Sequence, residues 1–205
     1  LRKDAEHSKI QLRLLVQVGA FIGEGSDLLE ISEYSSRAHS GEAKDHSDLL
    51  NCIFIGNDRN FDSDPLYGFN VLSEIASRAL SPGINDPGTA IQIIGSLVRM
   101  IHVVRGSYDN YEKNRSESSP DRPLVIQKIG AQDLFKQAFR AISRDGASNI
   151  EVIGFLQRNL RELSAIKQFT PSAEYTSDDI VDRASRAMVA TNDLVEMNLQ
   201  KLKKR

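Results

Sequence analysis

The sequence predicts an α+β fold that is mainly α, with a small β-rich module at residues 1–56 and a helical domain at residues 57–205. Near the N-terminus, hydrophobic residues alternate with polar ones, whereas in the rest of the chain apolar residues recur at helical spacing. Glycines mark expected turns in the first part, and prolines mark expected helix starts and loops in the second. A chain of 205 residues allows one or two domains with a sizeable core.

The overall composition narrows the range of functions. The chain has 26 lysine and arginine residues against 28 aspartate and glutamate residues, for a formal net charge of −2. Proteins that bind nucleic acid usually carry a surplus of basic residues, so we expect no nucleic-acid partner. The one cysteine, Cys52, lies in an apolar run and is expected to be a small core residue without a disulfide. No apolar run approaches the roughly 20 residues of a membrane-spanning helix.

Short strands are expected in the N-terminal module. Over residues 12–18, apolar side chains alternate with more polar ones, which is the periodicity of a half-buried strand. A glycine-containing turn follows, and apolar runs predict further strands at residues 28–31 and 52–55. Residues 124–126 are expected to form a short strand or an extended segment.

Two helices are predicted from their starts. Ser63-Asp64-Pro65 and Asn85-Asp86-Pro87 each place a capping side chain before a proline at the first helical position, where a missing N–H does no harm. Apolar residues keep helical spacing behind both starts, so each helix is expected to bury one face.

The C-terminal half is expected to contain a loop and three more helices. Residues 107–123 are polar and aperiodic, which favours a flexible loop. Helices are predicted at residues 131–144, from a capping box at Ser148 and Glu151, and from residue 177 to the end of the chain.

No familiar catalytic motif is present. The sequence has no phosphate-binding Walker loop, no dinucleotide-binding glycine fingerprint and no nucleophile elbow. The four histidines lack the spacing of a zinc site. We therefore expect no cofactor and no metal site, and assign no catalytic residue. The sequence leaves open whether the chain is an enzyme and favours a role without catalysis.

The stretch from residue 78 to residue 90 is the most informative. It fits a turn between two helices, in which Gly83 takes a conformation that other residues cannot adopt and Asp86 caps the second helix. The same stretch also fits a ligand or partner site, because a helix N-terminus beside an arginine attracts an anion. The candidate binding residues in this stretch are Arg78, Ser81, Asn85, Asp86 and Thr89.

Residues 56–90 resemble a bacterial family of predicted integral membrane proteins of unknown function. The family block runs Asp-Pro-x-x-Gly, then an amphipathic helix, then Ala-Leu-Ser-Pro-Gly-x-Asn-Asp-Pro-x-Thr-Ala, and it matches residues 64–68 and 79–90. The family's Gly-x-x-Arg lead-in is similar to the segment from Gly56 to Arg59. On the first helix the family often has aspartate where this chain has Glu74, which keeps the charge on a longer arm.

The resemblance implies that transmembrane helices precede this chain in the full-length protein, and that the chain is the soluble C-terminal domain. Residues 18–29 also resemble the hairpin of biotinyl- and lipoyl-like sandwiches. That hairpin normally presents a carrier lysine at its tip, and none is evident here, so we expect a β module that serves as a scaffold.

Three hypotheses about function follow. The first is a scaffold, assembly or ligand-sensing module on the cytoplasmic face of the membrane, with its own transmembrane segment, further copies of itself and a small anionic ligand as partners. The second is a cytoplasmic gating module of a channel or transporter. The third is an enzyme with an unfamiliar site near the turn at residues 81–89, built from Arg59, Asp64, Arg78, Asn85 and Asp86.

Overall fold

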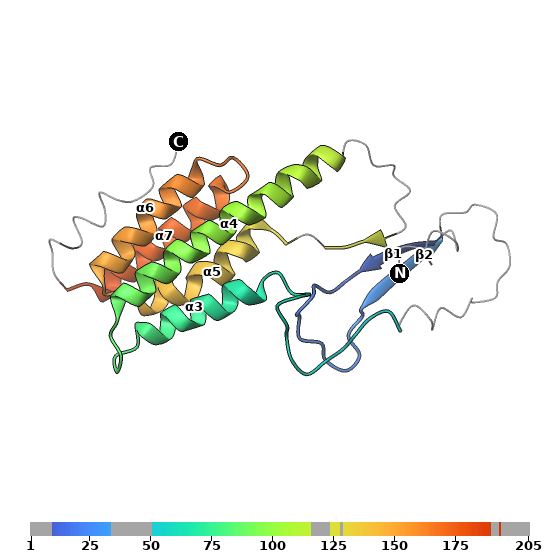
Figure 1. Cartoon of the computed structure of the whole chain (residues 1–205), viewed down its shortest axis with the longest axis horizontal. Helices are drawn as coiled ribbons and strands as arrows, with labels where there is room; N and C mark the ends of the chain where they lie inside the picture. Colours follow the sequence, from blue (N-terminus) through green and yellow to red (C-terminus); the bar gives the residue numbers. More distant parts are fainter. Residues whose placement is uncertain (1–9, 34–50, 116–123, 128, 190–192, 194–205) are drawn as a thin grey trace. The chain divides into compact units, whose positions relative to one another are not determined.

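The computed structural model describes residues 10–33, 51–115, 124–127, 129–189 and 193. Within these residues it contains five helices and a small sheet of three strands (Figure 1). The expected α+β class with a mainly helical content is therefore confirmed.

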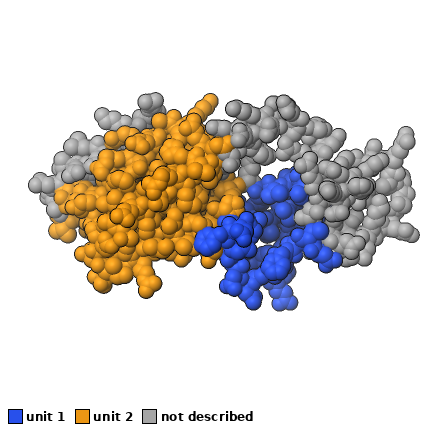
Figure 2. Space-filling view, in the orientation of Figure 1, with its two compact units in different colours: residues 1–64, 109–128 blue, residues 65–108, 129–205 orange. Residues whose placement is uncertain are grey.

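The chain divides into two compact units. Unit 1 comprises residues 1–64 and 109–128, and unit 2 comprises residues 65–108 and 129–205 (Figure 2). This division differs in two ways from the single boundary expected at residue 56. Unit 1 extends to residue 64, and the chain returns to it over residues 109–128. No local pattern in the sequence marks such a return.

Unit 1 contains the three-stranded sheet, in the order β2-β1-β3. Strand β1 (Ile10–Leu14) pairs antiparallel with β2 (Leu29–Glu33) and parallel with the two-residue β3 (Leu124–Val125). Leu12 of the central strand lies opposite Ile31 and Leu124 and is fully buried. The alternating pattern at the N-terminus therefore does form a strand, although it ends at Leu14 and does not extend to residue 18.

The strand expected at residues 52–55 is wrong. These residues form a turn followed by irregular chain, and Cys52, Phe54 and Ile55 are exposed. Both edges of β1 are already occupied by β2 and β3, so this run has no place beside the buried strand. An apolar run of four residues does not specify a strand without a pairing partner. Cys52 is thus a surface residue and not the expected core residue.

Unit 2 is a helical bundle around one hydrophobic core. Its helices are α3 (Tyr67–Ala79), α4 (Pro87–Arg115, of which the unit takes the part up to Tyr108), α5 (Ala131–Asp145), α6 (Ile150–Ser164) and α7 (Thr170–Ala187). The rings of Phe135, Phe139 and Phe169 meet in the core, with centroids 5.7 Å apart in each contacting pair. Edge-to-face and tilted arrangements of this kind are the favoured aromatic geometries.

Helix α4 differs from expectation in two ways. It continues to Arg115, so the loop expected from residue 107 is helical over its first part, and residues 116–123 lie outside the described residues. Its segment Pro87–Gly106 has a mean hydropathy of 1.3 and is long and apolar enough to cross a membrane, by length and composition alone.

Core packing accounts for part of that apolarity, since 33% of the apolar segment of α4 is buried. The stripe formed by Ala90, Ile94, Leu97 and Ile101 is completely buried in the bundle, while residues such as Arg99 are exposed on the other face. The helix is therefore amphipathic with one broad face in the core of unit 2.

The ends of α5, α6 and α7 agree only in part with the prediction. Helix α5 ends at Gly146 as expected, and α6 is capped by Asn149, whose side-chain Oδ1 accepts from the Val152 N–H at 2.9 Å, and not by Ser148. Helix α7 starts at Thr170, seven positions before the expected residue 177, and has a proline in its first turn. Most of the expected continuation beyond Ala187 lies outside the described residues.

Candidate functional site

The candidate residues lie in two places. Arg59 and Asp64 belong to unit 1, whereas Arg78, Ser81, Asn85, Asp86 and Thr89 belong to unit 2.

In unit 1, Arg59 and Asp64 bind each other. The Arg59 Nε donates to Asp64 Oδ2 at 2.5 Å, and the Asp64 side chain is 1% exposed. Asp64 was expected to cap α3, but the cap position is Leu66 and no side chain caps that end. A nearly buried carboxylate needs a cationic partner more than a helix end needs a cap, because an unpaired buried charge is far less stable than an uncapped exposed N–H.

Gly19 makes room for this ion pair. It has a φ of +79°, and a Cβ built on it would lie 1.8 Å from Asp64 Oδ2 and 2.9 Å from Arg59 Nε. The backbone of the β1–β2 connection therefore packs directly against the pair. Any other residue at position 19 would meet both the backbone strain of positive φ and a clash with the carboxylate.

In unit 2, residues 80–86 form a compact connection between α3 and α4, which we call the Ser81 turn. Its backbone closes on itself: the Asn85 N–H donates to Ser81 O and the Asp86 N–H donates to Ala79 O, both at 2.8 Å. The Ser81 hydroxyl donates to Arg78 O at 2.7 Å. The residue with the unusual conformation is Asn85, with a φ of +49°, and not Gly83 as expected. Asparagine tolerates this left-handed conformation better than most residues.

Asp86 caps α4 as the sequence predicts. Its Oδ1 accepts from the Thr89 N–H at 3.0 Å, and its Oδ2 accepts from the Thr89 hydroxyl at 2.5 Å. The hydrogen bond from the Thr89 hydroxyl, helped by the Thr89 backbone N–H, holds the pKa of Asp86 below its usual value. Asp86 and Thr89 thus satisfy each other and the first turn of the helix.

The other three candidates line a groove beside the turn, which we call the Ser81 groove. Its volume is about 640 Å³. Arg78, Ser81 and Asn85 line it, whereas Asp86 and Thr89 do not. The groove is also lined by Glu74, Ser77, Leu80, Pro82, Asp145 and Ser148.

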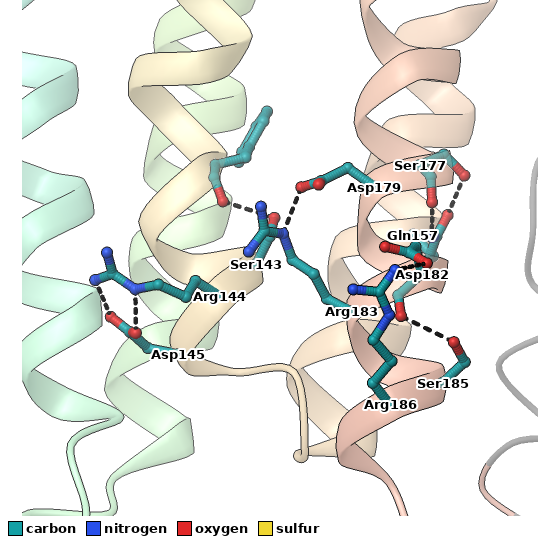
Figure 3. Close-up of polar contacts among 11 residues, drawn as sticks. Ser143, Arg144, Asp145, Gln157, Ser177, Asp179, Asp182, Arg183, Ser185 and Arg186 are labelled. Carbon is teal, nitrogen blue, oxygen red and sulfur yellow. Dashed lines mark hydrogen bonds and ion pairs between the residues drawn. The ribbon is translucent and has the colours of Figure 1, made fainter.

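Asp145, which is not among the candidate residues expected from the sequence, reaches the groove from the end of α5. The Arg144 guanidinium donates to both of its oxygens, at 2.6 Å and 2.8 Å, and the Ser77 hydroxyl of α3 donates to it as well (Figure 3 shows the Arg144 contact). These hydrogen bonds, Arg144 first, lower the pKa of Asp145 below its usual value, although partial burial opposes them. One signal was available: a carboxylate in the last turn of a helix faces the negative end of the helix dipole, so it calls for another explanation.

The groove combines charges of both signs. Glu74 accepts a hydrogen bond from the Asn70 amide at 2.7 Å, and Asp145 is held by Arg144 and Ser77. The Arg78 side chain lines the same groove and, among the residues that the structure describes, has no hydrogen bond or ion pair. Within the same described residues, no three histidine, cysteine, aspartate or glutamate side chains gather as a metal site. The groove therefore offers recognition of a polar, charged ligand.

Comparison with known proteins gives a family match over most of the chain. A family model described as "Predicted membrane protein (DUF2254)" matches residues 1–162 of the 205. Uncharacterized proteins of Mycobacterium bovis and of two strains of Mycobacterium tuberculosis are each 36% identical over 69 residues, which is 33% of this chain. The match spans 13% of the length of these relatives. No solved structure matches the chain.

Proposed function

The chain belongs to this family of predicted membrane proteins, and from that premise we propose that it forms a ligand-sensing module, outside the bilayer, of a bacterial integral membrane protein. The Ser81 groove is the proposed ligand site. The observation that carries the proposal is the Arg78 guanidinium, which lines the groove and has no side-chain partner among the described residues.

The open donors of Arg78 favour recognition over a purely structural role. A guanidinium carries five N–H donors in a planar fork that matches a carboxylate. The position of Arg78 in the last turn of α3 accounts for its charge, because the helix dipole favours a cation there. It does not account for the unused donors. Asn85 lines the same groove from its left-handed conformation, which adds a second polar group.

The charges in the groove favour a small zwitterion, such as a free amino acid. Arg78 would hold the carboxylate of such a ligand, while Glu74 on the same groove suits its ammonium group, because the charge of Asp145 is already balanced by Arg144. A purely anionic ligand would gain from Arg78 but would be repelled by Glu74. The anion that the sequence led us to expect at this turn is therefore less well matched here than a zwitterion.

A thermal-shift screen of the full-length protein in nanodiscs against free amino acids tests the proposal. We expect at least one amino acid to raise the unfolding temperature of the wild type. The shift should disappear in Arg78→Ala and persist in Arg99→Ala, which removes an exposed arginine from α4. The proposal fails if no amino acid gives a shift, or if Arg78→Ala responds as the wild type does.

We also propose that the module lies on the cytoplasmic face of the membrane. Thiols persist in the reducing cytoplasm, whereas secreted domains tend to use their cysteines in disulfides. The single cysteine of the chain, Cys52, is exposed, and the chain has no second cysteine for an internal disulfide. This exposure also makes Cys52 a direct reporter of sidedness.

A further inference from the structure

A second cavity, of about 240 Å³, lies between α5 and α7 in unit 2. It shares no lining residue with the Ser81 groove. Helix α5 contributes Lys136 and Arg140, and helix α7 contributes Asp179 and Arg183. The cavity thus gathers three cationic side chains against one carboxylate.

Two of these cations have no anionic partner in the part of the chain that the structure describes. Lys136 and Arg140 are four residues apart on α5, so they lie on the same face one turn apart and repel each other. Among the described residues, neither side chain has an ion pair or a hydrogen bond. A bound anion would convert this repulsion into two attractive contacts.

Arg183 adds a third cation from the opposite wall. Its Nε donates to Asp179 Oδ2 at 2.7 Å, which orients the guanidinium (Figure 3). An arginine held through Nε by one carboxylate still has the N–H donors of its two terminal nitrogens. Asp179 therefore positions Arg183 and cancels only one of the three positive charges that line the cavity.

Two of the hydroxyls that line the cavity are already used. Ser143 donates to Phe139 O at 2.7 Å within α5, and Thr176 donates to Ser172 O at 2.7 Å within α7 (Figure 3 shows the Ser143 contact). Besides the hydroxyls of Ser172 and Tyr175 and the amide of Gln132, a ligand in the cavity would meet cationic donors. Lysine and arginine together are the side chains that proteins use most for phosphate, arginine through its planar fork and lysine as a point charge.

We propose that the cavity between α5 and α7 binds a phosphate group through Lys136, Arg140 and Arg183. The phosphate belongs either to free inorganic phosphate or to the headgroup of an acidic phospholipid. This site is independent of the ligand proposed for the Ser81 groove, because no lining residue is common to the two. An anion was expected from the sequence at the Ser81 turn. The cavity between α5 and α7 suits an anion better, because three cations and one carboxylate line it.

Calorimetric titration of the full-length protein in detergent tests the site, with inorganic phosphate in one arm and dihexanoyl phosphatidic acid in the other. We expect one of them to bind the wild type, and the arm that binds more tightly identifies the source of the phosphate. The double variant Lys136→Gln/Arg140→Gln should weaken binding about tenfold or more, since each charged hydrogen bond contributes about that factor. Arg140→Lys should retain part of the affinity because it keeps the charge.

The matched control is Arg99→Gln/Arg158→Gln, which removes the same two charges from exposed positions on α4 and α6. It should bind as the wild type does. The site is wrong if neither compound binds the wild type, if Lys136→Gln/Arg140→Gln binds as tightly as the wild type, or if the control loses as much affinity. Lys136 and Arg140 are both exposed, so folding of the variant is checked by circular dichroism as a routine matter.

Discussion

Gly19, Arg59 and Asp64 behave as one structural feature. The glycine supplies a left-handed backbone with no side chain, and that gap is filled by the carboxylate of Asp64 and the Nε of Arg59. Gly19 is far from Asp64 in the sequence and Arg59 is five residues from it, so neither belongs to the Ser63-Asp64-Pro65 tripeptide that made Asp64 look like a helix cap. The role of Asp64 is set by these two contacts outside the tripeptide.

Replacing Gly19 should therefore destabilise unit 1 far more than replacing a comparable glycine. Gly25 is the matched control, since its φ is +81° but a Cβ there meets nothing within 4 Å. Gly25→Ala should lower the free energy of unfolding by about 1–2 kcal/mol, which is the energetic penalty of a left-handed alanine. Gly19→Ala should lower it by about 3 kcal/mol more, because this variant also separates a buried ion pair. Urea unfolding of the two variants measures the difference, and equal losses would show that the pair is not disturbed.

Asp86 gives a prediction about pH. Its pKa is lowered in the folded state by Thr89, so its contribution to stability is present above the usual value of 3.8 and is lost as the pH falls through the lower folded value. Asp86→Asn should have a lower free energy of unfolding than the wild type at neutral pH, and this difference should disappear as the pH falls below 3.8.

Urea unfolding as a function of pH checks this expectation for Asp86. The control is Asp58→Asn, an exposed aspartate whose carboxylate accepts no hydrogen bond among the described residues. A gap between Asp86→Asn and the wild type that stays constant down to acid pH would contradict the assigned role of Thr89.

At the scale of whole elements, helix starts were predictable where a local side chain does the capping. The Asn85-Asp86-Pro87 signal succeeded because Asp86 bonds to Thr89, three residues ahead. The similar Ser63-Asp64-Pro65 signal failed because Asp64 is used by Arg59 instead. The extra length of α4 was also missed, since residues 107–115 lack apolar periodicity and their helix continues one that is already formed.

Helices α6 and α7 are joined by a buried amide. The Gln157 Nε2 donates to Ser177 O at 3.1 Å, and the Ser177 hydroxyl donates to Gln157 Oε1 at 2.8 Å. Both residues are completely buried, so the amide specifies how the two helices align (Figure 3). A polar pair in an apolar core is tolerated only when its groups are satisfied in this reciprocal way.

Gln157→Leu should lower the free energy of unfolding by about 1–3 kcal/mol, because Ser177 then loses two buried hydrogen bonds. The double variant Gln157→Leu/Ser177→Ala should lose less than the sum of the two single variants, since the two groups act on each other. Chemical denaturation of the four proteins provides the comparison. Strict additivity would mean that the amide does not couple the helices.

At the scale of the whole molecule, the sequence correctly predicted the fold class and the existence of most elements, but only one wall of the Ser81 groove. Arg78, Ser81 and Asn85 lie close together in the chain and could be grouped by inspection. Asp145 and Ser148 reach the groove through the packing of α5 on α3, which the Ser77–Asp145 hydrogen bond records. Long-range packing of this kind leaves no signature in residue spacing.

The exposed Cys52 permits a test of membrane sidedness in the full-length protein. A membrane-impermeant maleimide should label Cys52 in inverted membrane vesicles and leave it unlabelled in spheroplasts, because the module is proposed to face the cytoplasm. The Cys52→Ser variant identifies labelling at any other cysteine of the full-length protein. Labelling of Cys52 in spheroplasts would place the module on the outer face.

The central claim is that the Ser81 groove is the ligand site, and hydrogen–deuterium exchange tests it without any substitution. The full-length protein is compared with and without a saturating concentration of the amino acid that gives the largest thermal shift. We predict slower exchange in residues 78–90 and 145–148, which line or border the groove from α3, the Ser81 turn and the end of α5. Protection confined to other parts of the chain, with these two segments unchanged, would contradict the claim.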